Sequence, residues 1–224
     1  MTFNIILSFA FLIFSLLLCR FNKEKLGGVK NRNFYIALSL VFSLSFILRI
    51  FLGYYTEGFE TDLYTFKAWG NILNTTKWDE IYSLNTFIDY PPGYLYILGG
   101  LDKLRIDLGI GMYDEIFTLM IKLPSIIADM VTGVLIYFLG KKRVGEFNSL
   151  LISAAYLFCP AVLVNSAVWG QADSFTALLL LVSVILLYKD RVFPAAAVYG
   201  LGVICKPQMR IFAPLFIFAL LYRK

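Results

Sequence analysis

The stretch LMIKLPSIIADMVTGVLIYFLG, residues 119–140, decides the class of fold. It is long enough to cross a bilayer, because a helix needs about 20 apolar residues to span roughly 30 Å of hydrocarbon. It also carries Lys122 and Asp129, which lie two turns apart and therefore share one helix face. A charge at the centre of a span costs roughly 2.5–3.5 kcal/mol and usually faces a bundle interior or a wet cavity. The stretch predicts a membrane helix inside a bundle, with the two charges in a structural ion pair, in helix-to-helix hydrogen bonds or in a polar site.

The composition extends this interpretation to the whole chain. Hydrophobic residues make up 59% of the 224 positions and charged residues only 16%, which is typical of membrane helices rather than a soluble domain. We expect an all-α polytopic bundle of about seven spans, forming a single membrane domain over residues 1–224. The candidate spans are 3–19, 34–52, 118–140, 148–165, 171–188, 192–206 and 209–222.

The residue inventory limits the chemistry that is available. The run 3–19 lacks a basic start and a small-residue cleavage site, so we interpret it as a retained span with its N-terminus outside. The three cysteines lie in or beside apolar runs, which argues against a disulfide framework. Histidine is absent from the sequence, so carboxylates, lysines and arginines must do any chemistry.

The net charge of +5 does not indicate nucleic-acid binding, because the basic residues can all be placed on one side of the membrane. The basic segments are 20–33, 141–143, 189–191 and 223–224. Placing them all in the cytoplasm satisfies the positive-inside rule. The opposite, extracytoplasmic side then holds a long loop, 53–117, together with the turns 165–173 and 206–210. The protein is expected to be a multi-pass integral membrane protein, of the cell membrane if it is bacterial.

The stretch YPPGYLYILGG, residues 90–100, tests this topology. A full crossing here would invert every later loop and place the Lys-Lys-Arg of 141–143 outside. We therefore favour a re-entrant or interfacial helix that begins after Pro92 and returns to the same side. The long external loop is thus expected to carry juxtamembrane helices.

Acidic residues lie at the start of the loop 53–117 and at intervals along it. Glu57, Glu60 and Asp62 follow the second span, and Thr61-Asp62 is a plausible N-cap for a helix over 63–75. Asp62 is therefore either a capping residue or part of a site. Asp89, which precedes two prolines, either starts the interfacial helix or is held rigidly for binding.

Two later turns add polar groups on the same side. NSAVWGQADS, residues 165–174, contributes Trp169, Gln171 and Asp173, and CKPQMR, residues 205–210, contributes Lys206, Gln208 and Arg210 after a helix that Pro207 ends. Asp173 is either a helix N-cap or a site residue. Together the turns predict a polar cup at the outer membrane face. Motifs for nucleotide or zinc chemistry are absent from the sequence.

The ordered set of motifs resembles the GT-C superfamily of membrane glycosyltransferases, and in particular bacterial proteins similar to the GPI mannosyltransferase II family. The motifs are Asp62 with the KAW helix, DYPPGYLYIL, KLPSIIADM, NSAVWGQADS and KPQ, covering about residues 34–214. The resemblance implies inverting transfer of a hexose, mannose-like or glucose-like, from a polyprenyl-phosphate carrier to an extracytoplasmic glycan, lipid or protein acceptor. Asp62 matches the aspartate that acts as general base in the family.

The resemblance also implies roles for the other polar residues. Lys122 or Lys206, or less favourably Arg210 or Arg105, would bind the carrier phosphate. The residues expected to bind substrate are Asp89, Tyr90, Lys122, Asp129, Trp169, Gln171, Asp173, Lys206 and Gln208. A metal is not expected, because the branch works without one, although the acids at 57, 60 and 62 leave a divalent ion open.

One departure from the family pattern keeps other functions open. Family members continue for several spans after the KPQ helix, so the chain is expected to be a fragment, an inactive remnant or a half that a second polypeptide completes. A transporter or lipid-handling protein would use Lys122 and Asp129 as a coupling pair. A non-catalytic subunit would carry the polar cup without using it.

Overall fold

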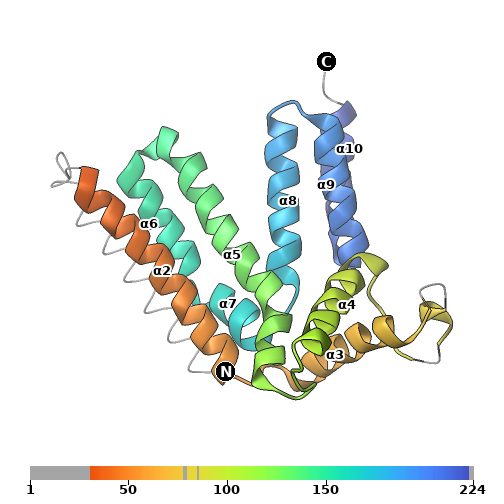
Figure 1. The fold of residues 1–224 in the computed structure, drawn as a ribbon. Helices are drawn as coiled ribbons and strands as arrows, with labels where there is room; N and C mark the ends of the chain where they lie inside the picture. Colours follow the sequence, from red (N-terminus) through yellow and green to blue (C-terminus); the bar gives the residue numbers. More distant parts are fainter. Residues whose placement is uncertain (1–30, 78–79, 85, 222–224) are drawn as a thin grey trace.

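The computed structural model describes residues 31–77, 80–84 and 86–221, and every regular element in these ranges is helical (Figure 1). The predicted span 3–19 lies outside them. The α-helices are α2 (Asn31–Tyr55), α3 (Glu60–Thr75), α4 (Pro92–Asp107), α5 (Glu115–Val144), α6 (Glu146–Leu157), α7 (Pro160–Leu163), α8 (Asp173–Tyr188), α9 (Val192–Cys205) and α10 (Ala213–Leu221). Short 3-10 segments, η1 (Ile81–Ser83) and η3 (Pro207–Phe212), and a π-helical segment, η2 (Val164–Trp169), complete the set.

Two of the described helices are long and apolar enough to cross a membrane. They are the Phe34–Tyr55 part of α2, with 22 residues, and α5, with 30 residues. They confirm the predicted helices at 34–52 and 118–140. The pair formed by α6 and the segment Pro160–Trp169 would make a third span, although it is bent by 48°.

The predicted span 148–165 is therefore not one straight helix. α6 ends at Leu157, and Cys159 adopts extended backbone with φ −61° and ψ 121°. Pro160 explains the break, because its ring disfavours helical backbone at the preceding residue and it has no N–H to donate. The chain restarts at Pro160 as α7 and widens into the π-helical segment.

The last three predicted spans are short helices in the structure. α8 has 16 residues and α9 has 14, so both are apolar helices below the length of a full straight span. The run 209–222 is divided between a 3-10 segment and α10, which has nine described residues.

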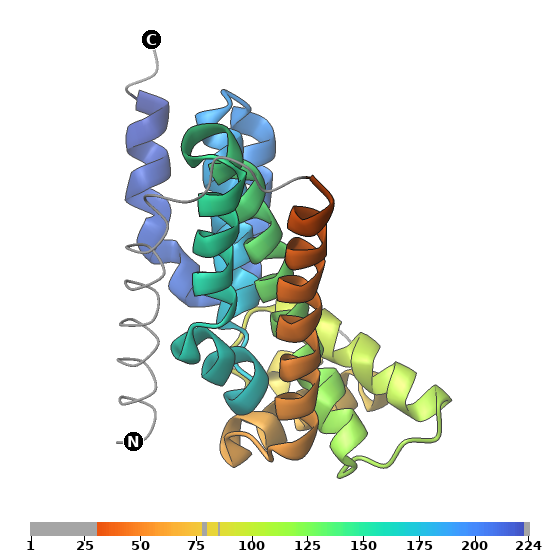
Figure 2. The ribbon, with the colours of Figure 1, turned by 90° about the vertical axis from the view of Figure 1, so that its left-hand side faces the viewer.

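The basic turns between helices lie at one end of the bundle, and the acidic segment lies at the other end. Figure 1 shows the α5–α6 turn, with Lys141, Lys142 and Arg143, and the α8–α9 turn, with Lys189 and Arg191, at the upper end of the bundle. α3 and α4 lie at the lower end, and Figure 2 shows the same separation from the side. The basic turns and the acidic loop thus lie at opposite ends of the helices, as the charge pattern predicts.

α4 begins at Pro92, where the sequence predicts a helix, and it does not carry the chain to the upper end (Figure 1). It packs on α3 through small residues. A Cβ atom on Gly70 would lie 2.8 Å from the carbonyl oxygen of Leu98, and one on Gly99 would lie 3.1 Å from Cβ of Leu73. The two glycines therefore permit a close helix–helix contact that fixes α4 against α3.

An aromatic core fills the space between α3, α4 and the start of α5. Phe66, Trp69, Tyr90 and Tyr94 pack with ring centroids between 5.2 and 6.1 Å apart, at tilted or edge-on angles. The Trp69 indole also donates a 2.8 Å hydrogen bond to the carbonyl of Phe87. These contacts hold Phe87 and Tyr90 against α3 and fix the position of α3.

A buried ion pair joins α2, α5 and α6. Arg49 Nε lies 3.4 Å from Asp129 Oδ2, and both side chains are fully buried. The other oxygen of Asp129 accepts a 3.0 Å hydrogen bond from the Tyr156 hydroxyl, while Arg49 also donates to Ser45. Asp129 is therefore satisfied by structural partners within the helices, which is the ion-pair alternative that the sequence left open.

Breaking this pair is expected to destabilise the bundle. Arg49→Ala or Asp129→Asn alone leaves a buried group without its partner and should cost about 3 kcal/mol. Replacing the group as a whole, with Arg49→Met, Asp129→Leu and Tyr156→Phe, should recover most of that loss. Unfolding of the purified chain in detergent measures this. Single variants as stable as the original chain would contradict it.

Candidate functional site

A left-handed glycine forms the turn that carries Trp169 and Gln171. Gly170 has φ +89°, and its N–H and that of Gln171 each donate a 3.1 Å hydrogen bond to the carbonyl of Asn165. A Cβ atom at this position would lie 2.8 Å from Leu63 Cδ2 and 3.2 Å from Lys122 Cγ. Glycine is therefore required here by both the backbone angle and the space.

A second glycine brings the start of α3 against this turn. Gly58 has φ +82°, and a Cβ atom there would lie 2.3 Å from Leu63 Cδ1 and 2.9 Å from the Trp169 carbonyl oxygen. The following residue, Phe59, donates its N–H to the same carbonyl at 3.2 Å, and its ring packs on the Trp169 indole at 5.1 Å. The first turn of α3 is thus held beside a segment more than 100 positions later in the chain.

Asp62 projects from that first turn into a hydrogen-bonded network. Its Oδ2 atom accepts a 2.9 Å hydrogen bond from Trp169 Nε1 and a second hydrogen bond from Gln171 Nε2. The N-cap of α3 is Phe59, without a side-chain capping bond, so the predicted N-cap at Thr61-Asp62 is wrong. The helix starts earlier than expected, and its first turn presents the carboxylate sideways to the 169–171 turn.

Lys206 brings a cation to the same network. α9 ends at Cys205 and Lys206 is extended, with only 7% of its surface exposed. Its ammonium forms an ion pair with Asp173, lies 3.5 Å from Gln171 Oε1 and sits 5.6 Å from the centre of the Tyr90 ring. Since an ammonium only donates and a carboxylate only accepts, the Gln171 amide links Lys206 to Asp62 with both of its ends satisfied.

Asp173 keeps Lys206 charged. Burial alone would lower the pKa of Lys206, but the hydrogen bond and charge of Asp173, with Tyr90, more than offset it and hold that pKa above its ordinary 10.5. Asp173 is the first residue of α8 and not its N-cap, which is Ala172. Its second oxygen accepts a 3.2 Å hydrogen bond from Asn165, so the carboxylate serves the network rather than the helix start.

Lys122 lies beside the turn but is committed to backbone groups. It is fully buried, and its ammonium donates to the carbonyls of Gly53 and Thr56 at 3.1 and 2.7 Å. A cation is favourable there because the last carbonyls of a helix have no partner within the helix. Lys122 therefore caps α2, and it does not pair with Asp129 as a coupling pair would require.

The structure does not bring every predicted residue into the network. Asp89 and Gln208 are exposed on connecting segments, and Asp129 belongs to the ion pair with Arg49. Tyr90 is buried in the aromatic core, where it forms a wall beneath Lys206. Of the predicted residues, the network joins Asp62, Trp169, Gln171, Asp173 and Lys206, with Tyr90 as its wall.

The acids that follow α2 do not form one cluster. Asp62 turns toward Trp169 and Gln171, whereas Glu57 and Glu60 line a cavity that Asp62 does not reach. Within the described ranges, no group of three or more acids or cysteines is placed to hold a metal ion.

Three contributors were missed by the sequence interpretation. Asn165 carries two backbone bonds and one side-chain bond of the network, and the Ser125 hydroxyl donates to the carbonyl of Gln171. Arg49 was missed as the partner of Asp129. An arginine inside an apolar run was the available signal for the last of these, while the other two are ordinary residues whose roles depend on the fold.

Comparison of the chain with protein-family models, with curated proteins and with solved structures finds no match in any of the three. The resemblance to GT-C glycosyltransferases therefore depends on the motifs quoted above. The feature of the structure that bears most directly on function is the Asp62–Gln171–Lys206 network.

Gly170→Ala should disrupt this network, because it imposes both a strained backbone angle and an overlap with Leu63. We expect a loss of about 1–3 kcal/mol of unfolding free energy. Gly100→Ala is the matched control, since a Cβ atom there meets nothing within 4 Å and lies in the interior of α4. It should be neutral or stabilising by about 0.5–1 kcal/mol. Equal effects of both variants in detergent unfolding would contradict the role of Gly170.

The Lys206–Asp173 ion pair should be insensitive to pH across the neutral range. Because the folded pKa of Lys206 lies above the ordinary 10.5, its stabilising contribution is complete below that pH and is lost only as the pH rises through the folded value. The difference in unfolding free energy between the original chain and Lys206→Met should stay constant from about pH 6 to about pH 9. A difference that fades within this interval would contradict it.

Proposed function

We propose that the chain is a membrane glycosyltransferase of the GT-C type, which moves a hexose from a polyprenyl-phosphate donor to an extracytoplasmic acceptor. The observation that carries this proposal is the Gln171 amide, which links the carboxylate of Asp62 to the ammonium of Lys206. A carboxylate base and an ammonium group that are linked by one side-chain amide suit a glycosyl transfer. The base can remove the proton of the acceptor hydroxyl, and the ammonium can bind the phosphate that leaves the donor. The proposal includes five further spans beside α2 and α5, as in the seven-span topology expected from the sequence.

Asp62 would act as the general base. Its carboxylate accepts the proton of the acceptor hydroxyl while that oxygen forms a bond to C1 of the sugar. The bond between C1 and the phosphate oxygen breaks from the opposite face, so the anomeric centre inverts and polyprenyl phosphate leaves. Trp169 and Gln171 would aim the carboxylate, since both donate to the same oxygen and leave the other one directed elsewhere.

Lys206 would bind the departing phosphate. A fixed, buried cation stabilises charge as it develops on the leaving group. The raised pKa of Lys206, which follows from Asp173 and Tyr90, keeps the side chain protonated at neutral pH. Asp173 would hold the Lys206 ammonium at the edge of the site. When the phosphate binds, the ammonium would interact with both the phosphate and Asp173.

The position of the network supports an extracytoplasmic reaction. The network lies at the lower end of the bundle in Figure 1, with α3, while the basic turns lie at the upper end. Under the positive-inside rule the basic end faces the cytoplasm. A polyprenyl-linked donor reaches such a site through the bilayer, so a nucleotide-binding loop is not needed.

Asp62→Asn should abolish sugar transfer while leaving the fold intact. A general base contributes about 100-fold to 10,000-fold, so the rate should fall at least about 100-fold. The assay incubates membranes containing the chain with radiolabelled polyprenyl-phosphate mannose or glucose and counts label in lipid, glycan and protein fractions. Asp107→Asn, an exposed aspartate at the end of α4, is the control and should keep full activity.

The same assay separates the competing functions. Label that crosses sealed vesicles without forming a new glycosidic bond would identify a transporter and would contradict the proposal. Membranes whose labelled products are unchanged by Asp62→Asn would indicate a non-catalytic subunit.

A further inference from the structure

A cavity of about 710 Å³ lies on a different side of α3 from the Asp62 network. It is formed by the end of α2, the first turns of α3 and the start of α5. On α3 its lining residues Glu60, Leu63, Tyr64 and Lys67 recur at a spacing of three or four and so share one face. The proposed reaction uses none of the polar groups in this cavity.

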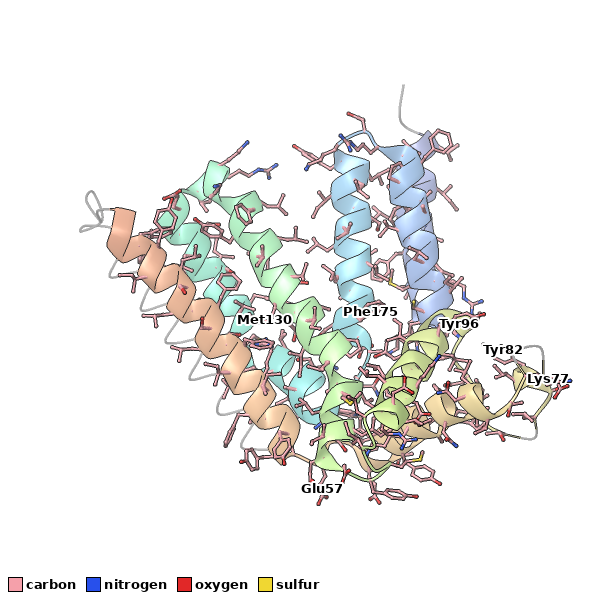
Figure 3. The ribbon with its side chains drawn as sticks, in the orientation of Figure 1. Glu57, Lys77, Tyr82, Tyr96, Met130 and Phe175 are labelled. Carbon is pink, nitrogen blue, oxygen red and sulfur yellow. The ribbon has the colours of Figure 1, made fainter. Side chains whose placement is uncertain are left out.

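The charge of the cavity is predominantly acidic. Glu57, Glu60 and Glu115 line it and are exposed, and Figure 3 labels Glu57 at the lower edge of the molecule. Among the described residues, no lysine or arginine forms an ion pair with any of the three. Among the lining residues that the structure describes, the one cation is Lys67, a buried side chain that donates a 2.7 Å hydrogen bond to the Thr118 hydroxyl. Three carboxylates against one ammonium favour a ligand with a positive charge.

Four tyrosines add aromatic surface to the cavity. Tyr54, Tyr55, Tyr64 and Tyr113 line the cavity, and the last three are 69%, 60% and 80% exposed. The faces of aromatic rings attract ammonium groups, most strongly quaternary ones, by about 0.5–2 kcal/mol each. Acids and tyrosines in one cavity are thus suited to an ammonium headgroup.

An apolar groove along α2 adjoins the cavity and shares two lining residues with it. Tyr54 and Tyr55 line both, and the groove, of about 370 Å³, runs from Phe46 to Tyr55. Its nine residue steps correspond to about 14 Å of helix, close to half of the roughly 30 Å hydrocarbon core. A groove of this length matches an acyl chain within one leaflet, with its headgroup at the tyrosine-rich end.

We propose that this cavity and groove bind one phospholipid with an ammonium headgroup, such as phosphatidylethanolamine, in the leaflet that faces the acidic end of the bundle. The ammonium lies among Glu57, Glu60 and Glu115, the phosphate lies toward Lys67, and an acyl chain follows α2. Lys67 can pair with the one phosphate of such a lipid. A headgroup that carries only negative charge would instead be repelled by the three carboxylates. The site does not depend on Asp62 or on the transfer reaction.

Native mass spectrometry of the purified chain in detergent tests this site. Phosphatidylethanolamine and phosphatidylglycerol with the same acyl chains are titrated separately, and bound lipid is counted. We expect at least about tenfold tighter binding of phosphatidylethanolamine. The double variant Glu57→Gln, Glu60→Gln should lose this preference, and Glu146→Gln, an exposed glutamate beyond the far end of α5, should keep it.

A substitute variant and three competing results complete the test. If the double variant does not fold, Glu115→Gln takes its place with the same expectation. Equal binding of the two lipids, tighter binding of polyprenyl phosphate, or full competition by free ethanolamine at the same concentration would each overturn the proposal. Asp62→Asn should leave the lipid preference unchanged even where it abolishes sugar transfer, so failure of one proposal is distinguishable from failure of the other.

Discussion

The contact between Asp62 and Gln171 depends on two backbone positions that only glycine can occupy. Gly58 lets the chain pass close to the Trp169 carbonyl, and Gly170 reverses the chain so that Gln171 points back toward α3. Side chains at either position would separate the two segments. Once they are held together, one amide group joins a carboxylate to a buried ammonium, and the other features of the site follow from this.

Burial explains why the polar groups inside the helix bundle are paired as they are. A buried charge without a partner costs several kcal/mol, so each one must meet an opposite charge or a set of carbonyl oxygens. Arg49 pairs with Asp129 across two helices, and Lys122 bonds to the end of α2. These residues hold the scaffold. Of the residues in the proposed reaction, Asp62 and Asp173 are instead partly exposed at the end of the bundle, beside the buried Lys206.

The parts of the fold and the site that the sequence predicts are those with local signals. Apolar length located α2 and α5, and Pro92 and Pro207 marked a helix start and a helix end. The grouping of Asp62, Trp169, Gln171 and Lys206 followed from assigning loops to sides by charge. The pairing of Asp129 with Arg49 was missed because contacts between helices have no local pattern. The break within the run 148–165 was not predicted, because the run is continuously hydrophobic and Pro160 was not interpreted as a helix break.

The proposed reaction requires that Asp62 and Gln171 face one side of the membrane and that the basic turns face the other. Labelling of single cysteines by a membrane-impermeant maleimide in sealed vesicles tests this directly, on a chain whose Cys19, Cys159 and Cys205 are replaced by serine. Asp62→Cys and Gln171→Cys should both react from the same face, and Lys142→Cys only from the opposite face. Reaction of the first two positions from opposite faces would contradict the account.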